Sequence, residues 1–506
     1  MPLVLAAIAV LLLVAARLVV HPGLLASPGG EVYGHAWVQW WHSEALPGWP
    51  AGTSLAEGAA SWPVIDPLPT AFAAGLWRMF GPLVGYNAWI LLAVALAFAG
   101  GAFLAKQEDG DPLTGGLTLA LWPALLGSLM SGLTEDGGLG LIAAGLALIG
   151  RDRPWSGVLA GLSLGLAAWC GLVIAWVAAV VAVGLTLASN RRAWPGLLLG
   201  GLLAGLIVAP LALVHADRLG GAGHRAGSVI ARAEPLWRLN PWHGIDLLSL
   251  IAPGRQDPGD ALVRIHPGYL GIVPLLLAVR SGWSRWWVVL VGCALLALGP
   301  VISVAGEPTG VPNPVAALAH LLPLGDLLNH HGRALLIGGV AMSALAARGV
   351  MRLPERARLP AALLLAVDLA LLSPAPVPLP ITPLDAPDAA HMLADLPGEH
   401  VLVVPAAGPG IHFQRPLLDQ RIHQRPLRLS PNRPGAPIET DAGMWLAGLA
   451  FPQPPPVPEE IDLPEMIVLA MPGYAEDVAA GLGTPDVLGA DGSAAWAVRG
   501  ETMPVD

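Results

Sequence analysis

The chain has 506 residues, of which 55% are hydrophobic and only 12% are charged, and its formal net charge is -10. So apolar a composition, with a mean hydropathy of +0.63, excludes a soluble domain with a fully wetted surface and indicates an integral membrane protein. The acidic balance argues against nucleic acid as a partner, because phosphate binding needs a basic face. Both cysteines, Cys170 and Cys293, lie in apolar segments and predict neither a disulfide framework nor a thiolate metal site.

Apolar runs of membrane-spanning length predict about 11 transmembrane helices, although several runs are shorter than a perpendicular span needs. The first run lacks the basic start of a secretory signal, so we expect it to remain as a helix. The sequence therefore predicts a mainly α, polytopic transmembrane bundle over residues 1–373. The runs lie near 2–20, 82–105, 113–130, 137–150, 155–170, 171–188, 193–214, 268–281, 285–303, 332–350 and 358–373.

The loops between these runs alternate in charge. Arginine and lysine occupy every second short loop, whereas the histidines occupy the others. Because short cytoplasmic loops collect basic residues, this pattern predicts a cytoplasmic N-terminus and outer loops at 21–81, 215–267 and 304–331. The preference for arginine over lysine is typical of a GC-rich bacterial genome, so we expect a multi-pass protein of the bacterial inner membrane.

The C-terminal part differs in composition from the rest. A proline-rich segment containing SPAPVPLPITPLDAP predicts a stiff, extended linker over residues 374–390. Short β-like runs follow at 400–407, 465–473 and 494–498, with a helical pattern at 475–482. We expect residues 391–506 to form a small periplasmic α/β domain.

The stretch GGEVYGHAWVQWWHSEAL, residues 29–46, follows directly on the first apolar run. On a helix, its polar side chains fall on one side and its aromatic side chains on the other. This predicts an amphipathic helix lying on the outer leaflet with its indoles among the lipid headgroups. Its polar arc is either solvated or functional, and the sequence leaves both readings open. The arc consists of Glu31, His35, Gln39 and His42, and the aromatic side of Tyr33, Trp37, Trp40 and Trp41.

This stretch and four others resemble the GT-C superfamily, polytopic membrane glycosyltransferases that use polyprenyl-phosphate-linked sugars. The resemblance covers most of the chain and implies a GT-C-like bundle with an acidic residue in the first outer loop. Two features of the sequence depart from the usual pattern. Glu31 stands where aspartate is more common, and His330 and His331 replace the expected arginine-containing sequence. The other stretches are PLVGYNAWILLAVALAFAGGAFLAKQ, HPGYLGIVPLLLAV, LLALGPVISVAG and HLLPLGDLLNHHGRALLIG.

Sugar transfer from a lipid phosphate to a hydroxyl needs a base near the acceptor and cationic groups near the phosphate. We predict Glu31 as the base and His35, one turn further on, as the group that orients it or the acceptor. Glu57 and Asp66, later in the same loop, are expected either to be solvated or to bind substrate hydroxyls or a divalent cation. No cofactor beyond such a cation is expected, because the histidine-rich loops lack the spacing of a zinc site.

Two further loops hold candidate substrate-binding groups. The turn SGLTEDGG places Glu135 and Asp136 between two spans, where they could bind a cation or a sugar or simply be solvated. For the phosphate we predict Arg333 with His330 and His331, because guanidinium offers a bidentate fork and imidazolium adds a charge. The basic stretch within 215–267 is an equally open alternative.

The resemblance implies a membrane glycosyltransferase that moves a hexosyl or pentosyl group from a polyprenyl-phosphate donor to an envelope glycan, lipid or protein on the periplasmic face. One alternative is a non-catalytic envelope scaffold that has the same fold. The other is a transporter of a lipid-linked glycan, but such a path needs charged residues within the membrane and often an internal repeat. Few such charges and no obvious repeat occur in this sequence.

Overall fold

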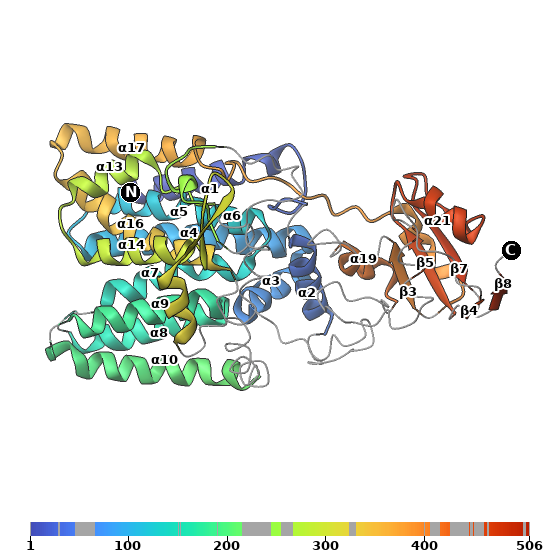
Figure 1. The fold of residues 1–506 in the computed structure, drawn as a ribbon, viewed down its shortest axis with the longest axis horizontal. Helices are drawn as coiled ribbons and strands as arrows, with labels where there is room; N and C mark the ends of the chain where they lie inside the picture. Colours follow the sequence, from blue (N-terminus) through green and yellow to red (C-terminus); the bar gives the residue numbers. More distant parts are fainter. Residues whose placement is uncertain are drawn as a thin grey trace.

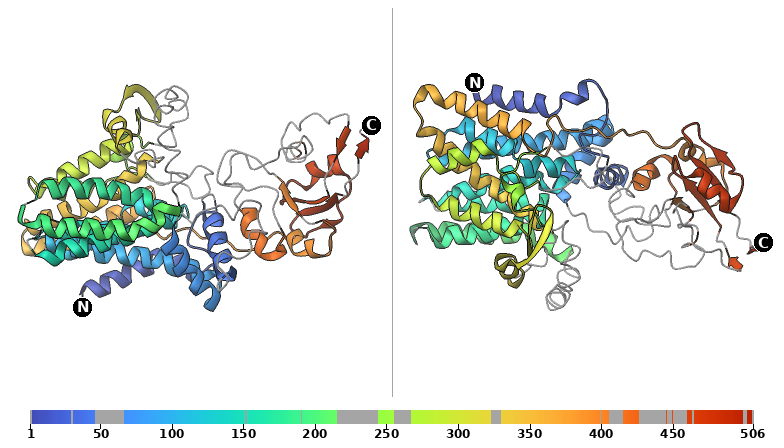
Figure 2. Two further views of the ribbon diagram at one scale, coloured as in Figure 1. Left: turned by 90° about the horizontal axis from the view of Figure 1, so that it is seen from below. Right: turned by 45° about the horizontal axis from the view of Figure 1, so that its top comes forward.

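The computed structural model describes residues 2–28, 31–45, 66–149, 151, 153–189, 191–214, 244–254, 267–322, 330–398, 400–404, 415–425, 445, 449, 460–462, 465–498 and 502–504. Figures 1 and 2 show a bundle of long helices that run roughly side by side, and a smaller domain with a sheet beyond one end of the bundle. The N-terminus lies in the bundle and the C-terminus in the smaller domain.

Every apolar run predicted as a span contains a helix. In lipid each backbone polar group must be satisfied within its own segment, so an apolar run of this length has no other stable conformation. The helices are α1 (Pro2–Val14), α4 (Pro82–Gln107), α5 (Pro112–Ala120), α6 (Pro123–Met130), α7 (Leu139–Leu148), α8 (Pro154–Cys170), α9 (Leu172–Leu187), α10 (Trp194–Val214), α13 (Ile272–Arg280), α14 (Arg285–Ala297), α16 (Ala334–Met351) and α17 (Glu355–Leu371).

Within the described residues, four helical stretches are long and apolar enough to cross a membrane: Pro82–Gln107, Pro112–Met130, Trp194–Leu213 and His331–Met351. The mainly helical membrane fold is therefore confirmed, whereas the count of about 11 spans stays a prediction. Short 3-10 turns cap or join the helices at η1 (Ala16–Val19), η4 (Thr134–Gly138), η5 (Arg191–Ala193), η7 (Leu248–Leu250), η9 (His331–Arg333) and η10 (Leu393–Asp395).

Helix α4 lies at the centre of the bundle, between α5 and α7 (Figure 1). It approaches α7 so closely that a Cβ added to Gly100 would lie 2.2 Å from the carbonyl oxygen of Gly140. Small residues permit this backbone contact, which replaces the hydrophobic driving force that lipid cannot supply. The contact holds the start of α7, and with it η4, close to α4.

In the described parts of the predicted outer loops, three helices lie outside the predicted spans: α2 (Val32–Ala45), α3 (Pro67–Phe80) and α15 (Pro314–Leu321). Strands β1 (Val301–Val304) and β2 (Glu307–Pro312) form an antiparallel hairpin before α15. Helices α2 and α3 pack on each other and lie at the bundle end that faces the smaller domain (Figure 1).

The proline-rich segment 374–390 packs against the bundle over part of its length. Leu379 donates its backbone N–H to the carbonyl oxygen of Val14 at 3.2 Å, and Thr382 and Leu24 exchange backbone hydrogen bonds of 2.9 and 2.8 Å. Ala375, Val377 and Leu379 are buried, because the prolines alternate with apolar residues that find a surface to cover. This part is therefore anchored rather than a free spacer.

The smaller domain contains a four-stranded sheet in the order β3-β5-β7-β6. The pair β3–β5 is parallel and the pairs β5–β7 and β6–β7 are antiparallel, which makes this a mixed sheet. The three predicted β runs and the predicted helix are all present. The elements are α18 (Asp388–Met392), β3 (Val401–Val404), α19 (Arg415–His423), β4 (Glu460–Asp462), β5 (Met466–Ala470), α21 (Ala475–Leu482), β6 (Val487–Leu488), β7 (Ala494–Val498) and β8 (Thr502–Pro504), of which β4 and β8 pair separately.

Helix α19 of this domain packs on the aromatic side of α2 (Figure 1). Trp37 Nε1 donates a hydrogen bond of 2.8 Å to Gln420 Oε1, and the guanidinium of Arg415 lies over the ring of Tyr33. Tyr33, Trp37 and Trp40 are buried. The expectation that these rings lie among lipid headgroups is therefore wrong, because a segment almost 400 residues away in sequence (|i−j| of 383) covers them instead.

Candidate functional site

A cluster of buried charged side chains lies where α2, α3, η4 and η9 meet. Helix α2 supplies His35, and Asp66 stands at the N-cap of α3. The turn η4 supplies Glu135, and Arg333 ends the turn η9 that opens α16. All four side chains are less than a tenth exposed. Four segments that are far apart in sequence therefore converge on one polar site.

The imidazole of His35 is fixed on its Nδ1 side by two oxygen atoms. Nδ1 lies 2.8 Å from Thr134 Oγ1 and 3.3 Å from Asp66 Oδ2. Thr134 donates its hydroxyl hydrogen to Asp66 Oδ2, so Nδ1–H is the donor to the threonine oxygen. Thr70 donates to the other oxygen of Asp66 at 3.0 Å. The carboxylate at this N-cap thus holds a histidine and two hydroxyl groups instead of capping the helix backbone.

The Nε2 side of His35 faces two carboxylates. It lies 3.3 Å from Glu135 Oε2 and 3.9 Å from Glu31 Oε2. The other oxygen of Glu135 accepts a hydrogen bond of 2.7 Å from Arg333 Nη2. Glu135 therefore bridges the imidazole and the guanidinium, and it connects α2 to the start of α16.

Glu31 lies at the edge of the cluster, and its side chain is 29% exposed. Its backbone N–H donates a hydrogen bond of 2.6 Å to the carbonyl oxygen of Ser131. This close approach depends on Gly132, which has a φ of +86° and where an added Cβ would lie 2.4 Å from the backbone nitrogen of Val32. The turn after α6 thus fixes the residue that precedes α2, and Glu31 is the carboxylate that an incoming molecule can reach.

Two further groups complete the polar surroundings. Asp136 is fully buried and its Oδ2 accepts a hydrogen bond of 2.7 Å from Ser128. Trp89 Nε1 of α4 donates to the backbone carbonyl of Thr134 at 3.0 Å, which holds η4 against the bundle. The Tyr86 hydroxyl is buried and has no hydrogen-bond partner among the described residues, and its ring lies near enough to interact with Asp66 and Glu135.

The cluster carries more negative than positive groups, and this sets its protonation. Burial on its own would lower the pKa of His35, but the charges of Glu135, Asp66 and Glu31 outweigh burial and raise the pKa to about 9. Burial raises the pKa of Glu135, against the lowering effect of His35 and Arg333. At neutral pH, therefore, His35 is an imidazolium.

Three of these residues could hold a metal ion. One ligand atom each from His35, Asp66 and Glu135 lie within 4.8 Å of one another. Glu135 Oε2 accepts no hydrogen bond from the described residues, although it is buried. One neutral imidazole and two carboxylates suit Zn²⁺ or Mn²⁺, and a set of three ligands leaves positions open for a substrate oxygen. Binding would release the proton that makes His35 an imidazolium, because ligation needs a free lone pair on the ring nitrogen. The donor set therefore fits a divalent cation, which would also offset the surplus negative charge.

The structure brings together six of the residues predicted from sequence: Glu31, His35, Asp66, Glu135, Asp136 and Arg333. Glu135 and Asp136 are buried, so the solvated turn that the sequence left open does not form. His330 and His331 lie at the start of η9, next to Arg333. Glu57 lies outside the described residues, as do the histidines and arginines of 215–243.

Sequence reasoning missed three hydroxyl residues that position the carboxylates, Ser128, Thr70 and Thr134. Threonine one turn after an N-cap aspartate is a local signal that could have pointed to Thr70. No local pattern points to Thr134 or Ser128, because their partners His35, Asp66 and Asp136 are brought to them only by the tertiary fold.

Known proteins resemble this chain in structure but not in sequence. No protein-family model and no curated protein matches the chain. The arabinofuranosyltransferase AftD from Mycobacteria, in a mutant form, matches with a TM-score of 0.52 and 17% identity over 95% of this chain. The chain spans 38% of the length of AftD.

Two structures of ArnT from Cupriavidus metallidurans also match over 97% of this chain and 96% of ArnT, at 14% identity. Their TM-scores are 0.39 for the apo state and 0.38 for the state bound to undecaprenyl phosphate. The match to the arabinofuranosyltransferase AftD confirms the predicted resemblance at the level of the fold. The membrane-length helices among the described residues indicate a multi-pass membrane protein, and its fold is similar to that of AftD.

Proposed function

We propose that the protein is a membrane glycosyltransferase that moves a sugar from a polyprenyl-phosphate donor to a hydroxyl group of an envelope glycan, lipid or protein. The observation that carries the proposal is the cluster itself. A reachable carboxylate, Glu31, lies 3.9 Å from a buried imidazole whose other side is fixed by Thr134 and Asp66. Sugar transfer needs a positioned base, and the fold shared with AftD supports this class of reaction.

In the proposed reaction Glu31 accepts the proton of the acceptor hydroxyl. The acceptor oxygen forms a bond to the anomeric carbon of the sugar while the bond from that carbon to the phosphate oxygen breaks. The polyprenyl phosphate leaves as a stable anion, so no strong acid is needed. His35, as an imidazolium beside Glu31, orients the carboxylate, and Glu135 holds His35 in place.

The phosphate needs positive charge, and Arg333 is the predicted source. Its Nη2 is bonded to Glu135, so the guanidinium is oriented from within the cluster. A divalent cation held by His35, Asp66 and Glu135 would replace the proton on the imidazolium of His35, and it would supply further electrostatic stabilisation to the phosphate oxygens. His330 and His331 remain predicted contributors to phosphate binding from the same turn.

The test is transfer from undecaprenyl-phosphate-linked hexoses and pentoses in proteoliposomes that contain the purified chain. We expect Glu31→Gln to reduce the rate about 10²- to 10⁴-fold, the usual contribution of a general base. Glu44→Gln on the exposed end of the same helix is the matched control and should leave the rate unchanged. Equal rates for Glu31→Gln and the native chain would remove Glu31 from the mechanism.

A non-catalytic scaffold remains the second candidate, and the burial of the cluster favours it. Arg333 already has a carboxylate partner, as it would in a purely structural network. Absence of transfer from every donor by a chain of native thermal stability would support the scaffold.

A separate measurement tests the cation. Isothermal titration of the metal-stripped protein with Mn²⁺ and with Zn²⁺ should show one site. We expect His35→Gln to weaken it by at least about 10-fold, the scale on which supporting groups already affect metal affinity. Undiminished binding by His35→Gln would place the cation elsewhere.

A further inference from the structure

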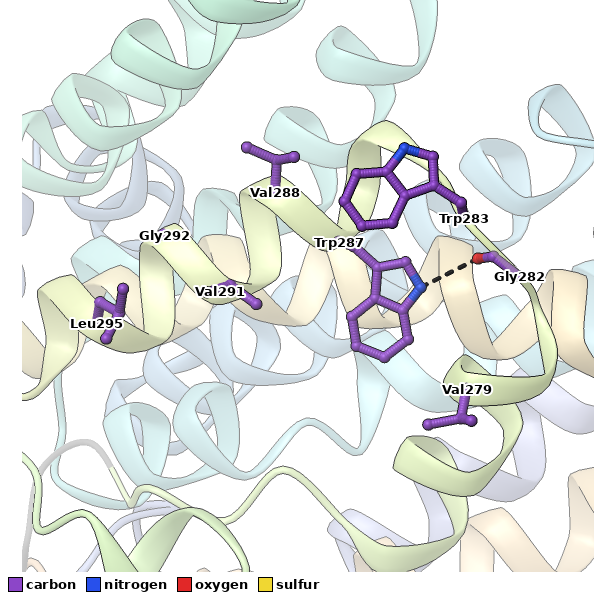
Figure 3. Close-up of a pocket in the computed structure, with 8 residues that line it drawn as sticks. All are labelled: Val279, Gly282, Trp283, Trp287, Val288, Val291, Gly292 and Leu295. Atoms are coloured by element: carbon purple, nitrogen blue, oxygen red, sulfur yellow. Dashed lines mark hydrogen bonds between the residues drawn. The ribbon is translucent and has the colours of Figure 1, made fainter.

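A groove on the surface of α13 and α14 lies away from the charged cluster and has a volume of about 720 Å³ (Figure 3). Its walls are apolar apart from the backbone and the indole N–H groups. Trp287 Nε1 donates to the carbonyl oxygen of Gly282 at 3.1 Å, which fixes one indole at the end of the groove, next to Trp283 (Figure 3). The lining residues are Val279, Gly282, Trp283, Trp287, Val288, Val291, Gly292 and Leu295.

The groove is about as long as one lipid leaflet is thick. Its lining runs along α14 from the start of the helix to Leu295, which at 1.5 Å per residue is roughly 15 Å. The hydrocarbon core of a bilayer is about 30 Å thick, so one leaflet contributes about half of that. Trp283 is 84% exposed at the end of the groove, where an indole at the membrane–water interface belongs. An acyl chain therefore fits along the groove with its head near Trp283.

The same end of the groove carries positive charge that no carboxylate among the described residues offsets. The guanidinium of Arg352 lies against Gly282, and its Nη1 donates to the backbone carbonyl of Arg280 at 2.9 Å. In the part of the chain that the structure describes, neither Arg280 nor Arg352 forms an ion pair. The neighbouring Arg285 and Arg348 are already paired with Glu108. The mouth of the groove is thus complementary to an anionic group.

We propose that this groove binds one phospholipid with an anionic headgroup, its phosphate at Arg280 and Arg352 and one acyl chain between Val279 and Leu295. The proposal is independent of the proposed glycosyl transfer, because none of these residues belongs to the charged cluster. Exposed leucines on α10, such as Leu202, show what ordinary lipid-facing surface looks like in this chain. The groove differs from it in being hollow and in having at its end two arginines, Arg280 and Arg352, that form no ion pair with any described residue.

Native mass spectrometry of the detergent-purified chain, titrated with phosphatidylglycerol or with phosphatidylcholine, tests the proposal. We expect one phosphatidylglycerol molecule to be retained more tightly than phosphatidylcholine. The double variant Arg280→Gln/Arg352→Gln should lose about 25-fold of that preference, because each arginine near a headgroup contributes about fivefold in affinity. Arg153→Gln, an exposed arginine before α8, is the control for net charge and should change little.

Gly292→Leu tests the groove itself. An added Cβ at Gly292 has nothing within 4 Å, so a leucine there fills the groove without disturbing the fold. Gly201→Leu on α10 has equally open surroundings and is the matched control. We expect Gly292→Leu to abolish retention and Gly201→Leu to preserve it, both at native melting temperature. Equal retention of both lipids, or retention by Gly292→Leu, would overturn the proposal. A dimer that Gly292→Leu disrupts would assign the groove to a second copy instead.

Discussion

Two clusters of charged side chains lie towards opposite ends of α4. Carboxylates are in excess in one cluster, and arginines are in excess in the other. Near the start of the helix, Trp89 holds η4, where Glu135 and its neighbouring carboxylates outnumber the positive groups His35 and Arg333. At the end of the helix, Glu108 accepts from Arg285 at 2.7 Å. Glu108 also lies 3.6 Å from Arg151 and 4.0 Å from Arg348. The 19 residues from Trp89 to Glu108 separate the two sites by about 28 Å.

The balance of charge in the two clusters indicates that the one at Glu108 is structural. The side chain of Glu108 is 9% exposed and has more positive partners than it needs, so it connects Arg151, the start of α14 and the end of α16 without requiring any other ion. The cluster at Glu135 buries carboxylates that the protein's own cations do not neutralise. Such an arrangement costs stability, and it persists at sites that bind or react. We therefore expect mutations at the two ends to separate activity from stability.

The largest effect is expected at the carboxylate-rich end. Glu135→Gln should lower sugar transfer at least about 100-fold, because His35 and Arg333 lose the group that positions both. The melting temperature should change little, since Asp136 and Glu31 still compensate Arg333. Transfer assays and thermal unfolding on the same preparations provide the measurement. A large loss of stability would make this cluster structural, like the one at Glu108.

The opposite outcome is expected at the arginine-rich end. Glu108→Gln leaves three arginines facing one another, and we expect it to cost about 2 kcal/mol of unfolding free energy, because the pairs are partly solvent-screened. Activity per folded molecule should stay unchanged. Glu307→Gln, at an exposed position of β2, is the matched control and should affect neither property. Loss of transfer by Glu108→Gln at native stability would contradict a purely structural role for the Glu108 cluster.

The most local effect concerns α19, which packs on α2 at the carboxylate-rich end. Burial lowers the pKa of His423 to about 4, and its Nδ1 accepts a backbone hydrogen bond of 3.2 Å from Arg425, which requires a neutral ring. Because the folded pKa lies below the ordinary value of 6.5, the stability that neutral His423 contributes is present above pH 6.5 and is lost as pH falls towards 4.

Hydrogen exchange of segment 415–423 should therefore speed up as pH falls from 7.5 to 5, by about 2 kcal/mol of opening free energy after correction for intrinsic rates. His423→Gln should flatten this dependence, whereas His391→Gln, at an exposed position, should not. A flat profile in the native chain would show that His423 is not buried as a neutral ring.

Much of the fold could be predicted from sequence because its rules are local. Each apolar run contains a helix, and the runs around β3, β5 and β7 are strands at the predicted places. The clustering of the site was only partly predictable. Glu31 and His35 lie one helical turn apart, which periodicity reveals. Their approach to Asp66, Glu135 and Arg333 joins residues about 30 to 300 positions apart, and no pattern along the chain encodes such contacts.

The aromatic side of α2 shows the same limit. The sequence correctly separates a polar and an aromatic side, but an aromatic side can be covered by lipid or by protein. In the structure Trp37 donates a hydrogen bond to Gln420 of α19, so the aromatic side is covered by protein.

The amino-acid sequence by itself determined that this is a membrane protein of helices with a small mixed α/β tail, because hydrophobicity and hydrogen bonding within a segment depend on neighbouring residues alone. The tertiary structure decided which carboxylates are buried together and which arginines balance them. That outcome depends on the close packing of α4 with α7 and of the turn after α6 with the start of α2, and glycine contacts such as Gly100 with Gly140 and Gly132 with Val32 make this packing possible.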